Sequence, residues 1–315
     1  MEKIVSKRHK GYFYLTLTLG SIFLLGLATI MLVTYVNACK DGSLTSKQNF
    51  LPLISLGTYI FTIYLVYCYF RNVPIVSIDK NTISIGKSTY NWIDATDIKL
   101  SGKQQFKCFG NFKYESTSIT FIDNTTKVFF DNFYSNTAEI KSFIDNVIIN
   151  KKESVENSLL PIDEADVANG FCDEIKGNVF TSYRGIFMLV YVGGIVFLDF
   201  KLENTNLIGF KCILSALAIF LFFALSLQMH FFLLSKDYLL VKNHTLLWKK
   251  NIFRLSDIRE IVFETHDKAP YCLRVITKQY KTKLFGAGTL RNNNWLELKD
   301  MLERYGVKVR NELPI

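Results

Sequence analysis

The chain has 315 residues, of which 49% are hydrophobic and 15% aromatic, and its formal net charge is +9. This hydrophobic share is high for a soluble protein and predicts long apolar segments, while five prolines are too few for long disordered linkers. The six cysteines form no CxxC pair and the four histidines are dispersed, which argues against a disulfide scaffold and against a zinc site. No cofactor or metal is expected.

Four apolar stretches follow one another along the chain. Residues 11–38 and 50–70 contain no charged residue, and each is long enough to cross a bilayer as a helix, which takes about 20 residues. Residues 212–234 form another uncharged stretch, and residues 185–198 form a shorter one whose length alone is borderline. We predict four transmembrane helices in two hairpins. The hairpins are residues 1–71, with spans of about 11–38 and 50–70, and residues 184–235, with spans of about 183–200 and 209–234.

Basic residues flank these spans on one side. Lys3, Lys7, Arg8 and Lys10 precede the first span, Arg71 follows the second, Arg184 precedes the third and Lys236 follows the fourth. By the positive-inside rule, both termini and both large polar regions are expected in the cytoplasm. In a rival interpretation, residues 36–39 (VNAC) form a lipoprotein cleavage site. Asn37 fits that site poorly, and the preceding apolar run exceeds a signal-peptide core.

Part of the sequence is repeated within the chain. Residues 92–98 (WIDATDI) match residues 255–261 (LSDIREI) at an offset of 163, and the match extends back without a gap to residues 76 and 239. Two more anchors keep the same order: KGYFYL (10–15) with RGIFML (184–189), and NTAE (136–139) with NWLE (294–297). The Asn-x-x-Glu pairs resemble helix caps and precede apolar positions at helical spacing. The pattern indicates a duplication, and it makes 185–198 a true span.

Each copy is expected to hold two membrane helices, several short strands and one amphipathic helix. The later strands are predicted at about 113–122 and 126–130 in the first copy, and at about 271–277 and 281–285 in the second. The two small domains are residues 72–149 and 236–315, and the acidic segment 150–183 is interpreted as a solvated linker. The predicted fold class is membrane α plus cytoplasmic α+β, in which each hairpin is followed by a small antiparallel sheet closed by a C-terminal helix.

This arrangement resembles the bacterial pleckstrin-homology-like (PH-like) membrane proteins. The matching parts are residues 11–70 with 73–149, and residues 184–234 with 236–306. The resemblance implies non-catalytic modules that bind or assemble at the membrane, some relatives of which are linked to resistance against membrane-active bacteriocins. Eukaryotic relatives in fold bind inositol lipids through a basic strand and loop. The nearest counterpart here is WKKNIFR with Lys249, Lys250 and Arg254, and the first copy offers only Lys87.

Motifs of known enzymes are absent: no GxxxxGK[ST], GxGxxG or GxSxG occurs, and no catalytic residue is expected. The uncharged spans contain no Asp or Glu, which argues against a proton-coupled transporter. The positive net charge is better explained by the orientation of the membrane spans and by attraction to anionic lipid than by binding of nucleic acid.

The main hypothesis is a membrane-anchored binding module for anionic headgroups or for a protein or peptide, with immunity to a membrane-active toxin as one role. Homo-oligomerisation is left open. The alternatives are a small transporter or channel built from a parallel duplication, and a membrane enzyme with an unrecognised site.

Overall fold

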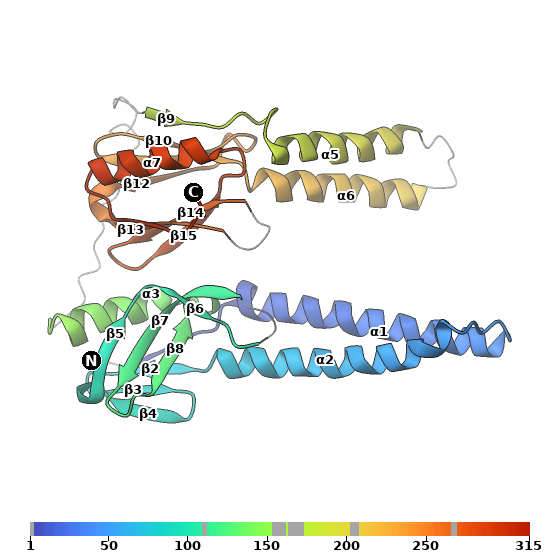
Figure 1. Cartoon of the computed structure of the whole chain (residues 1–315), viewed down its shortest axis with the longest axis horizontal. Helices are drawn as coiled ribbons and strands as arrows, with labels where there is room; N and C mark the ends of the chain where they lie inside the picture. Colours follow the sequence, from blue (N-terminus) through green and yellow to red (C-terminus); the bar gives the residue numbers. More distant parts are fainter. Residues whose placement is uncertain (1–2, 109–111, 153–161, 163–172, 202–207, 266–269) are drawn as a thin grey trace. The chain divides into compact units, whose positions relative to one another are not determined.

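A computed structural model describes residues 3–108, 112–152, 162, 173–201, 208–265 and 270–315. The chain divides into two compact units, Met1–Glu156 and Asn157–Ile315. Each unit combines a pair of long apolar helices with small, largely antiparallel sheets and a terminal helix, so the α+β part of the predicted fold class is confirmed (Figure 1).

In unit 1 a pair of long helices interrupts a sheet. The chain forms one short strand, runs through both helices, and then returns to pair with that strand at Ile4↔Ile78. The sheet has the order β1-β2-β3-β4. Its elements are β1 (Ile4–Val5), a π-helical turn (Lys10–Leu15) that continues as α1 (Thr16–Lys40), a 3-10 turn (Gln48–Phe50) that continues as α2 (Leu51–Asn72), β2 (Val76–Ile78), β3 (Thr82–Ile85) and β4 (Ser88–Asn91).

The second sheet of unit 1 is built around its longest strand, β7, which pairs with β5, β6 and β8. A helix follows, and its buried Ile140, Phe143 and Ile144 form the apolar face that the spacing predicts. The elements are a 3-10 turn (Trp92–Asp94), β5 (Ala95–Lys99), β6 (Lys103–Gln105), β7 (Lys113–Phe121), β8 (Thr126–Phe130), a 3-10 turn (Asp131–Phe133), α3 (Thr137–Phe143) and its π-helical continuation (Ile144–Ile149).

Unit 2 has a matching series of elements. Its first sheet has the order β12-β11-β10-β9, and a helix pair again separates the first strand from the second. Its second sheet has the order β15-β14-β13-β16. The elements are β9 (Asp173–Ile175), α5 (Tyr183–Lys201), α6 (Ile208–Ser226), β10 (His230–Leu234), β11 (Tyr238–Asn243), β12 (Lys250–Arg254), a 3-10 turn (Leu255–Asp257), β13 (Ile258–Glu264), β14 (Cys272–Thr277), β15 (Thr282–Gly286), α7 (Asn292–Arg304) and β16 (Val309–Asn311).

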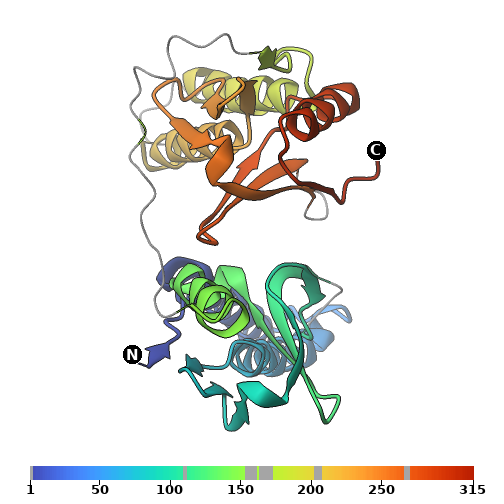
Figure 2. The ribbon, with the colours of Figure 1, turned by 90° about the vertical axis from the view of Figure 1, so that its left-hand side faces the viewer.

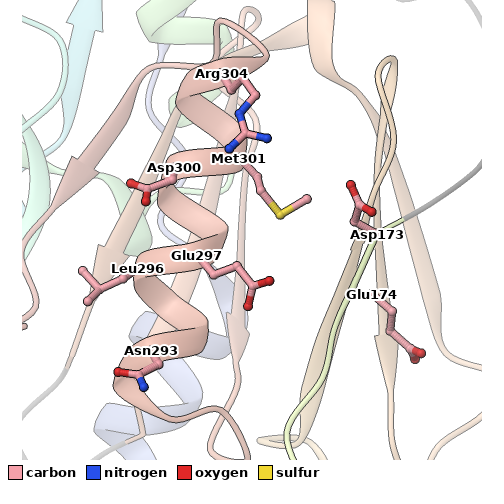
Figure 3. A pocket seen from close by; sticks show the side chains of 8 residues that line it. All are labelled: Asp173, Glu174, Asn293, Leu296, Glu297, Asp300, Met301 and Arg304. Carbon is pink, nitrogen blue, oxygen red and sulfur yellow. The ribbon is translucent and has the colours of Figure 1, made fainter.

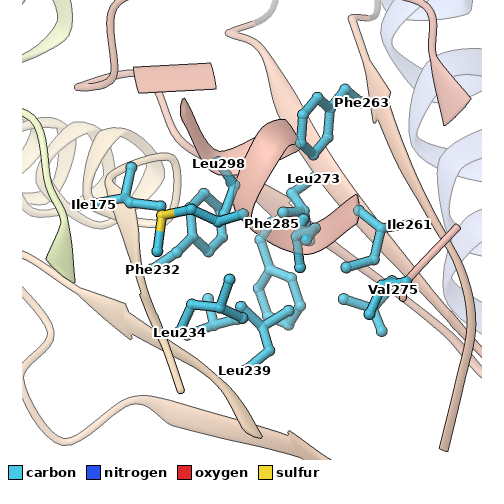
Figure 4. Packing of buried hydrophobic residues seen from close by; sticks show 14 of the residues in the cluster. Ile175, Phe232, Leu234, Leu239, Ile261, Phe263, Leu273, Val275, Phe285 and Leu298 are labelled. Carbon is cyan, nitrogen blue, oxygen red and sulfur yellow. The ribbon is translucent and has the colours of Figure 1, made fainter. Parts of the chain in front are cut away.

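The core of unit 2 lies between its sheets and α7 (Figures 2 and 4). Trp295 and Leu298 on the helix are fully buried, and the ring of Trp295 meets that of Phe263 edge-on at 4.9 Å. Phe232 on β10 and Ile175 on β9 belong to the same cluster. Strands on both sides of the helix pair therefore contribute to one core, which fixes the helix pair to the sheet at both of its ends.

The two similar phrases occupy the same place in their units. Trp92 and Leu255 each begin a 3-10 turn, and their amides donate to Asn81 and Asp237 at 3.0 and 2.8 Å. A β-bulge follows in both, next to Ala95 and to Ile258. Each phrase therefore ends one strand and turns into the next.

The gapless extension of this match towards the N-terminus is wrong. Trp92 and Leu255 are 163 residues apart, whereas their hydrogen-bond partners Asn81 and Asp237 are 156 apart. The hairpin of β11 and β12 is therefore seven residues longer than that of β3 and β4, because its loop has six residues against two and its strands are longer by three residues in total. β3 corresponds to β11, but at a different offset from the one found in the sequence. Strands in which apolar and polar residues alternate can be matched to one another at several offsets.

The prediction of four membrane spans holds for two of them. Among the described residues, Lys10–Lys40 and Gln48–Asn72 are long and apolar enough to cross a membrane, whereas Tyr183–Leu198 and Leu214–Ser226 are shorter apolar helices. The expected fourth span, 209–234, extends too far, since α6 ends at Ser226 and residues 230–234 form β10. A short apolar run such as HFFLL fits a buried strand and a helix equally well.

Two further expectations differ from the structure. The segment 150–183, interpreted as a linker, contains β9, and the boundaries 72–149 and 236–315 leave out β1, β9 and β10.

The Asn-x-x-Glu pairs are not two equivalent helix caps. Asn136 precedes α3 without capping it and instead binds the backbone of Lys7 and Val5, at 2.8 and 3.0 Å. Asn294 lies inside α7 and accepts from the amide of Arg291 at 3.1 Å.

Candidate functional site

The site begins where α6 ends in unit 2. From Ser226 the chain leaves through β10 and returns through β11, and the amide of His244 then donates to the carbonyl of Met229 at 3.0 Å. We call residues 244–249, which join β11 to β12, the tip loop. It lies at the helix end of unit 2, the end at which the chain enters and leaves α5 and α6. There the side chain of Arg184 donates to that of Gln228 at 2.6 Å.

Asn243 holds the tip loop in place. Its side-chain nitrogen donates to the carbonyl of Ser226 at 2.7 Å, and its side-chain oxygen accepts from the amides of Thr245 and Leu246 at 3.0 and 2.9 Å. Leu246 points inward and is 4% exposed. The loop is thus tied both to the helix and to the core, so the side chains that follow are held outward.

The outward side chains of the tip loop are apolar and basic. Leu247 is 78% exposed and Trp248 is 75% exposed, and the exposed Lys249 and Lys250 come directly after them. β11 ends at Asn243, so Leu247 and Trp248 belong to the loop and not to the strand. An apolar pair without alternation, followed at once by two lysines, is the signal that could have identified this loop.

The four residues predicted for lipid or partner contact are not all brought together. Lys249 and Lys250 are neighbours at the tip. Arg254 lies at the opposite end of β12, about 13 Å along the strand from Lys250, and pairs with Asp257 at 3.6 Å. Lys87 belongs to unit 1, where its exposed turn lies at the corresponding helix end. The amide of Gly86 in that turn donates to Ile75, just after α2.

Two histidines near the tip loop favour their neutral forms. Burial, assisted by the positive charge of Lys176, lowers the pKa of His244 from 6.5 to about 4. Burial also lowers the pKa of His230, whose Nδ1 lies 3.0 Å from the carbonyl oxygen of Gly286. Both rings are therefore neutral near neutral pH, and they add no positive charge to that of the lysines.

Two cavities border α7 in unit 2. One, of about 670 Å³, separates α7 from β9, and Glu297 and Met301 point across it towards the strand (Figure 3). It is lined by Asp173, Glu174, Asn293, Leu296, Glu297, Asp300, Met301 and Arg304. The other, of about 540 Å³, lies at the start of α7 and is lined by Lys176, Gly177, Asn178, Thr181, Thr289, Arg291, Asn293 and Asn294.

Within the described part of the chain, no three His, Cys, Asp or Glu side chains are grouped as metal ligands would be. Comparison with known proteins adds no assignment, since no family model and no curated protein matches this chain.

Proposed function

We propose that this chain is a non-enzymatic integral membrane protein that presents two PH-like binding modules at the cytoplasmic face of the bacterial inner membrane. One observation carries the proposal: in each unit a pair of exposed apolar helices is inserted between the first and second strands of one sheet. A membrane helix pair in this position fixes a folded domain to the bilayer surface at two points of its chain.

The surface of the helices supports their place in lipid. Phe23 and Ile63 are each 70% exposed, and Leu53 is 68% exposed. Such a surface is unfavourable in water but suits a bilayer, where helices satisfy their own backbone groups. Small residues mediate the contact of α1 with α2, because the hydroxyl of Ser55 donates to the carbonyl of Ala28 at 2.8 Å. Small and hydroxylated residues are typical of contacts between membrane helices.

In this proposal α5 and α6 form the second membrane hairpin. Each has 19 residues, and 1.5 Å per residue gives about 28 Å, close to the thickness of the hydrocarbon core. Phe197 and Phe220, 61% and 67% exposed, then face lipid. The basic residues around the helices assign both termini to the cytoplasm.

Binding rather than catalysis is supported by the chemistry of the exposed ends. Lys249 and Lys250 at the tip loop, and Lys87 in unit 1, offer positive charge at the helix ends, where anionic headgroups would lie. In unit 2 the two sheets and α7 enclose one core, which supports the proposal of a PH-like module. Protection against a membrane-active toxin would follow if such a module captured the toxin or its target at the membrane.

Topology reporters test the membrane part of the proposal. A reporter active only outside the cytoplasm is fused at residue 44, between α1 and α2, and at residue 315. We expect activity at residue 44 and none at residue 315. Activity at residue 315 would refute the four-span arrangement. Crosslinking of the chain in native membranes then identifies the protein or peptide partner, with a Lys249→Gln/Lys250→Gln variant as the matched control.

A further inference from the structure

The tip loop carries two large apolar side chains that the described residues of unit 2 leave exposed, Leu247 at 78% and Trp248 at 75%. We infer that Leu247 and Trp248 insert into the lipid interface beside α5 and α6, and so form a second, non-helical contact of this unit with the membrane. The inference rests on the proposed function, because it requires α5 and α6 to be membrane helices. The inference extends the proposed function, because it names the lipid interface as what the tip loop binds and names two apolar side chains that make the contact.

The position of the loop supports this inference. Asn243 binds the carbonyl of Ser226, the last residue of α6, and His244 binds that of Met229, so the loop starts level with the end of the helix. If α6 ends at the membrane surface, Leu247 and Trp248 lie at the depth of the headgroups. Tryptophan is enriched at this depth because its ring is apolar while its N–H can still meet water.

The charges beside the apolar pair fit the same surface. Lys249 and Lys250 follow Trp248, and Lys250 lies directly across the strand pair from Lys242. Like charges in opposite positions repel one another, and an anionic membrane would offset that repulsion. The apolar side chains of the tip loop therefore suit the acyl-chain region of an anionic bilayer, and the lysines beside them suit its headgroup region.

Unit 1 offers an internal comparison. Its corresponding turn has only two residues, Gly86 and Lys87, against six in the tip loop, and has no apolar tip. The exposed Ile93 of unit 1 is 87% exposed but lies at the far end of β4 from this turn. The longer loop thus adds to unit 2 an exposed apolar pair that the turn of Gly86 and Lys87 does not have.

Tryptophan fluorescence tests the inference on the full chain reconstituted in vesicles. Lipids brominated near the headgroup quench only tryptophans that reach them. The chain has three tryptophans, and Trp92 and Trp295 are 8% and 0% exposed within their units. We expect bromolipid to quench part of the emission of the parent chain, and we expect that part to disappear in Trp248→Phe. The substitution is at an exposed position, so folding is not at risk. Ile93→Ser serves as a matched loss of an exposed apolar side chain and should leave the quenching unchanged.

Vesicle flotation after an alkaline wash distinguishes failure of this inference from failure of the proposed function. If the chain floats and Trp248 emits as in water without quenching, the inference is overturned while the proposed function stands. Blue-shifted but unquenched emission of Trp248 would also overturn it, because a protein surface would then cover the loop. If the chain does not float, the proposed function fails and the inference fails with it.

Discussion

The side chain of Asn243 joins a helix to a loop: its nitrogen donates to the carbonyl oxygen of Ser226 at 2.7 Å, while its oxygen accepts from the amides of Thr245 and Leu246. Asn243 is 1% exposed, so these bonds form away from water. The end of α6 and the tip loop therefore form one rigid piece. Movement of the helix would be passed directly to Leu247 and Trp248.

Replacing Asn243 with Ala should release the tip loop. The change removes the partner of the two loop amides, which costs about 1–3 kcal/mol, and one of the two donors to the Ser226 carbonyl, which still accepts from the amide of Met229 at 3.1 Å. Hydrogen–deuterium exchange at residues 244–249 should rise by about tenfold, since 1.4 kcal/mol corresponds to a factor of ten. The control is Asn251→Ala, where an exposed side chain meets Lys283 at 2.8 Å and little change is expected. Equal exchange in both variants would refute the anchoring role.

The helices and the two similar phrases could be predicted because their signals are local. Residues 11–38 are apolar without interruption, and the turns at Trp92 and Leu255 repeat a short pattern. The first strands could not be predicted. Ile4 pairs with Ile78 across the whole helix pair, and Ile175 pairs with Phe232 across the other. A two- or three-residue strand has too few residues to show alternation, and only the tertiary fold identifies it.

The candidate site was predicted in part. Lys249 and Lys250 were identified by charge, but Leu247 and Trp248 were not identified, because large apolar side chains are usually buried. Arg254 was grouped with the lysines by its nearness in sequence. Lys250 and Arg254 lie at opposite ends of β12. Lys249 and Lys250 therefore form a basic tip, whereas Arg254 forms a separate ion pair with Asp257.

This division predicts different roles for the three basic residues. The variant Lys249→Gln/Lys250→Gln should reduce the protection of the tip loop in anionic nanodiscs. At about 1 kcal/mol per charge, the loss is about 2 kcal/mol at most and smaller at high salt. Arg254→Gln should have no effect on this protection, because Arg254 lies at the other end of β12. Hydrogen–deuterium exchange in anionic and zwitterionic nanodiscs measures both. An equal effect of Arg254→Gln would contradict the division.

Stability of unit 2 should depend on one buried ion pair. Arg274 donates to Glu264 from two of its nitrogens, at 3.0 and 2.7 Å, and the two side chains are 2% and 0% exposed. Arg274→Met leaves a buried carboxylate without this partner and should cost about 3–5 kcal/mol. The control Lys299→Met removes a partly exposed pair with Glu303 in the same unit, at 3.9 Å, and should cost at most about 1 kcal/mol.

The double variant Arg274→Met/Glu264→Leu completes this test. It removes both charges and should recover most of the lost stability, because an apolar pair can replace a buried ion pair at little cost. Unfolding by denaturant is followed through the fluorescence of Trp295, which belongs to the same unit. Equal midpoints of the single and the double variant would show that the buried charge is not the cause.

Acid should destabilise unit 2 through His244. Its pKa is about 4 in the fold against 6.5 for the free group, so between these values the unfolded chain binds a proton that the folded chain does not. Stability therefore falls as the pH drops from about 6.5 towards about 4. In His244→Gln, which can still bond Thr289, this part of the fall should be absent. His230 retains its own contribution of the same sign. Thermal unfolding at about pH 7.5 and about pH 4.5 measures the difference. Parallel pH profiles of the variant and the parent would contradict the assignment.

The contact between α1 and α2 should depend on the small size of Ala28. Its side chain is 0% exposed and faces Ser55, which is 1% exposed, whereas most of the surrounding helix surface is open. Ala28→Leu would force the helices apart, lose the 2.8 Å hydrogen bond from Ser55, and cost about 1–3 kcal/mol. Gly26→Leu is the matched control, because a side chain at Gly26 meets no atom within 4 Å. Thermal unfolding of the detergent-solubilised chain compares the two. If both variants unfold at the temperature of the parent, the two helices are not held together at Ala28.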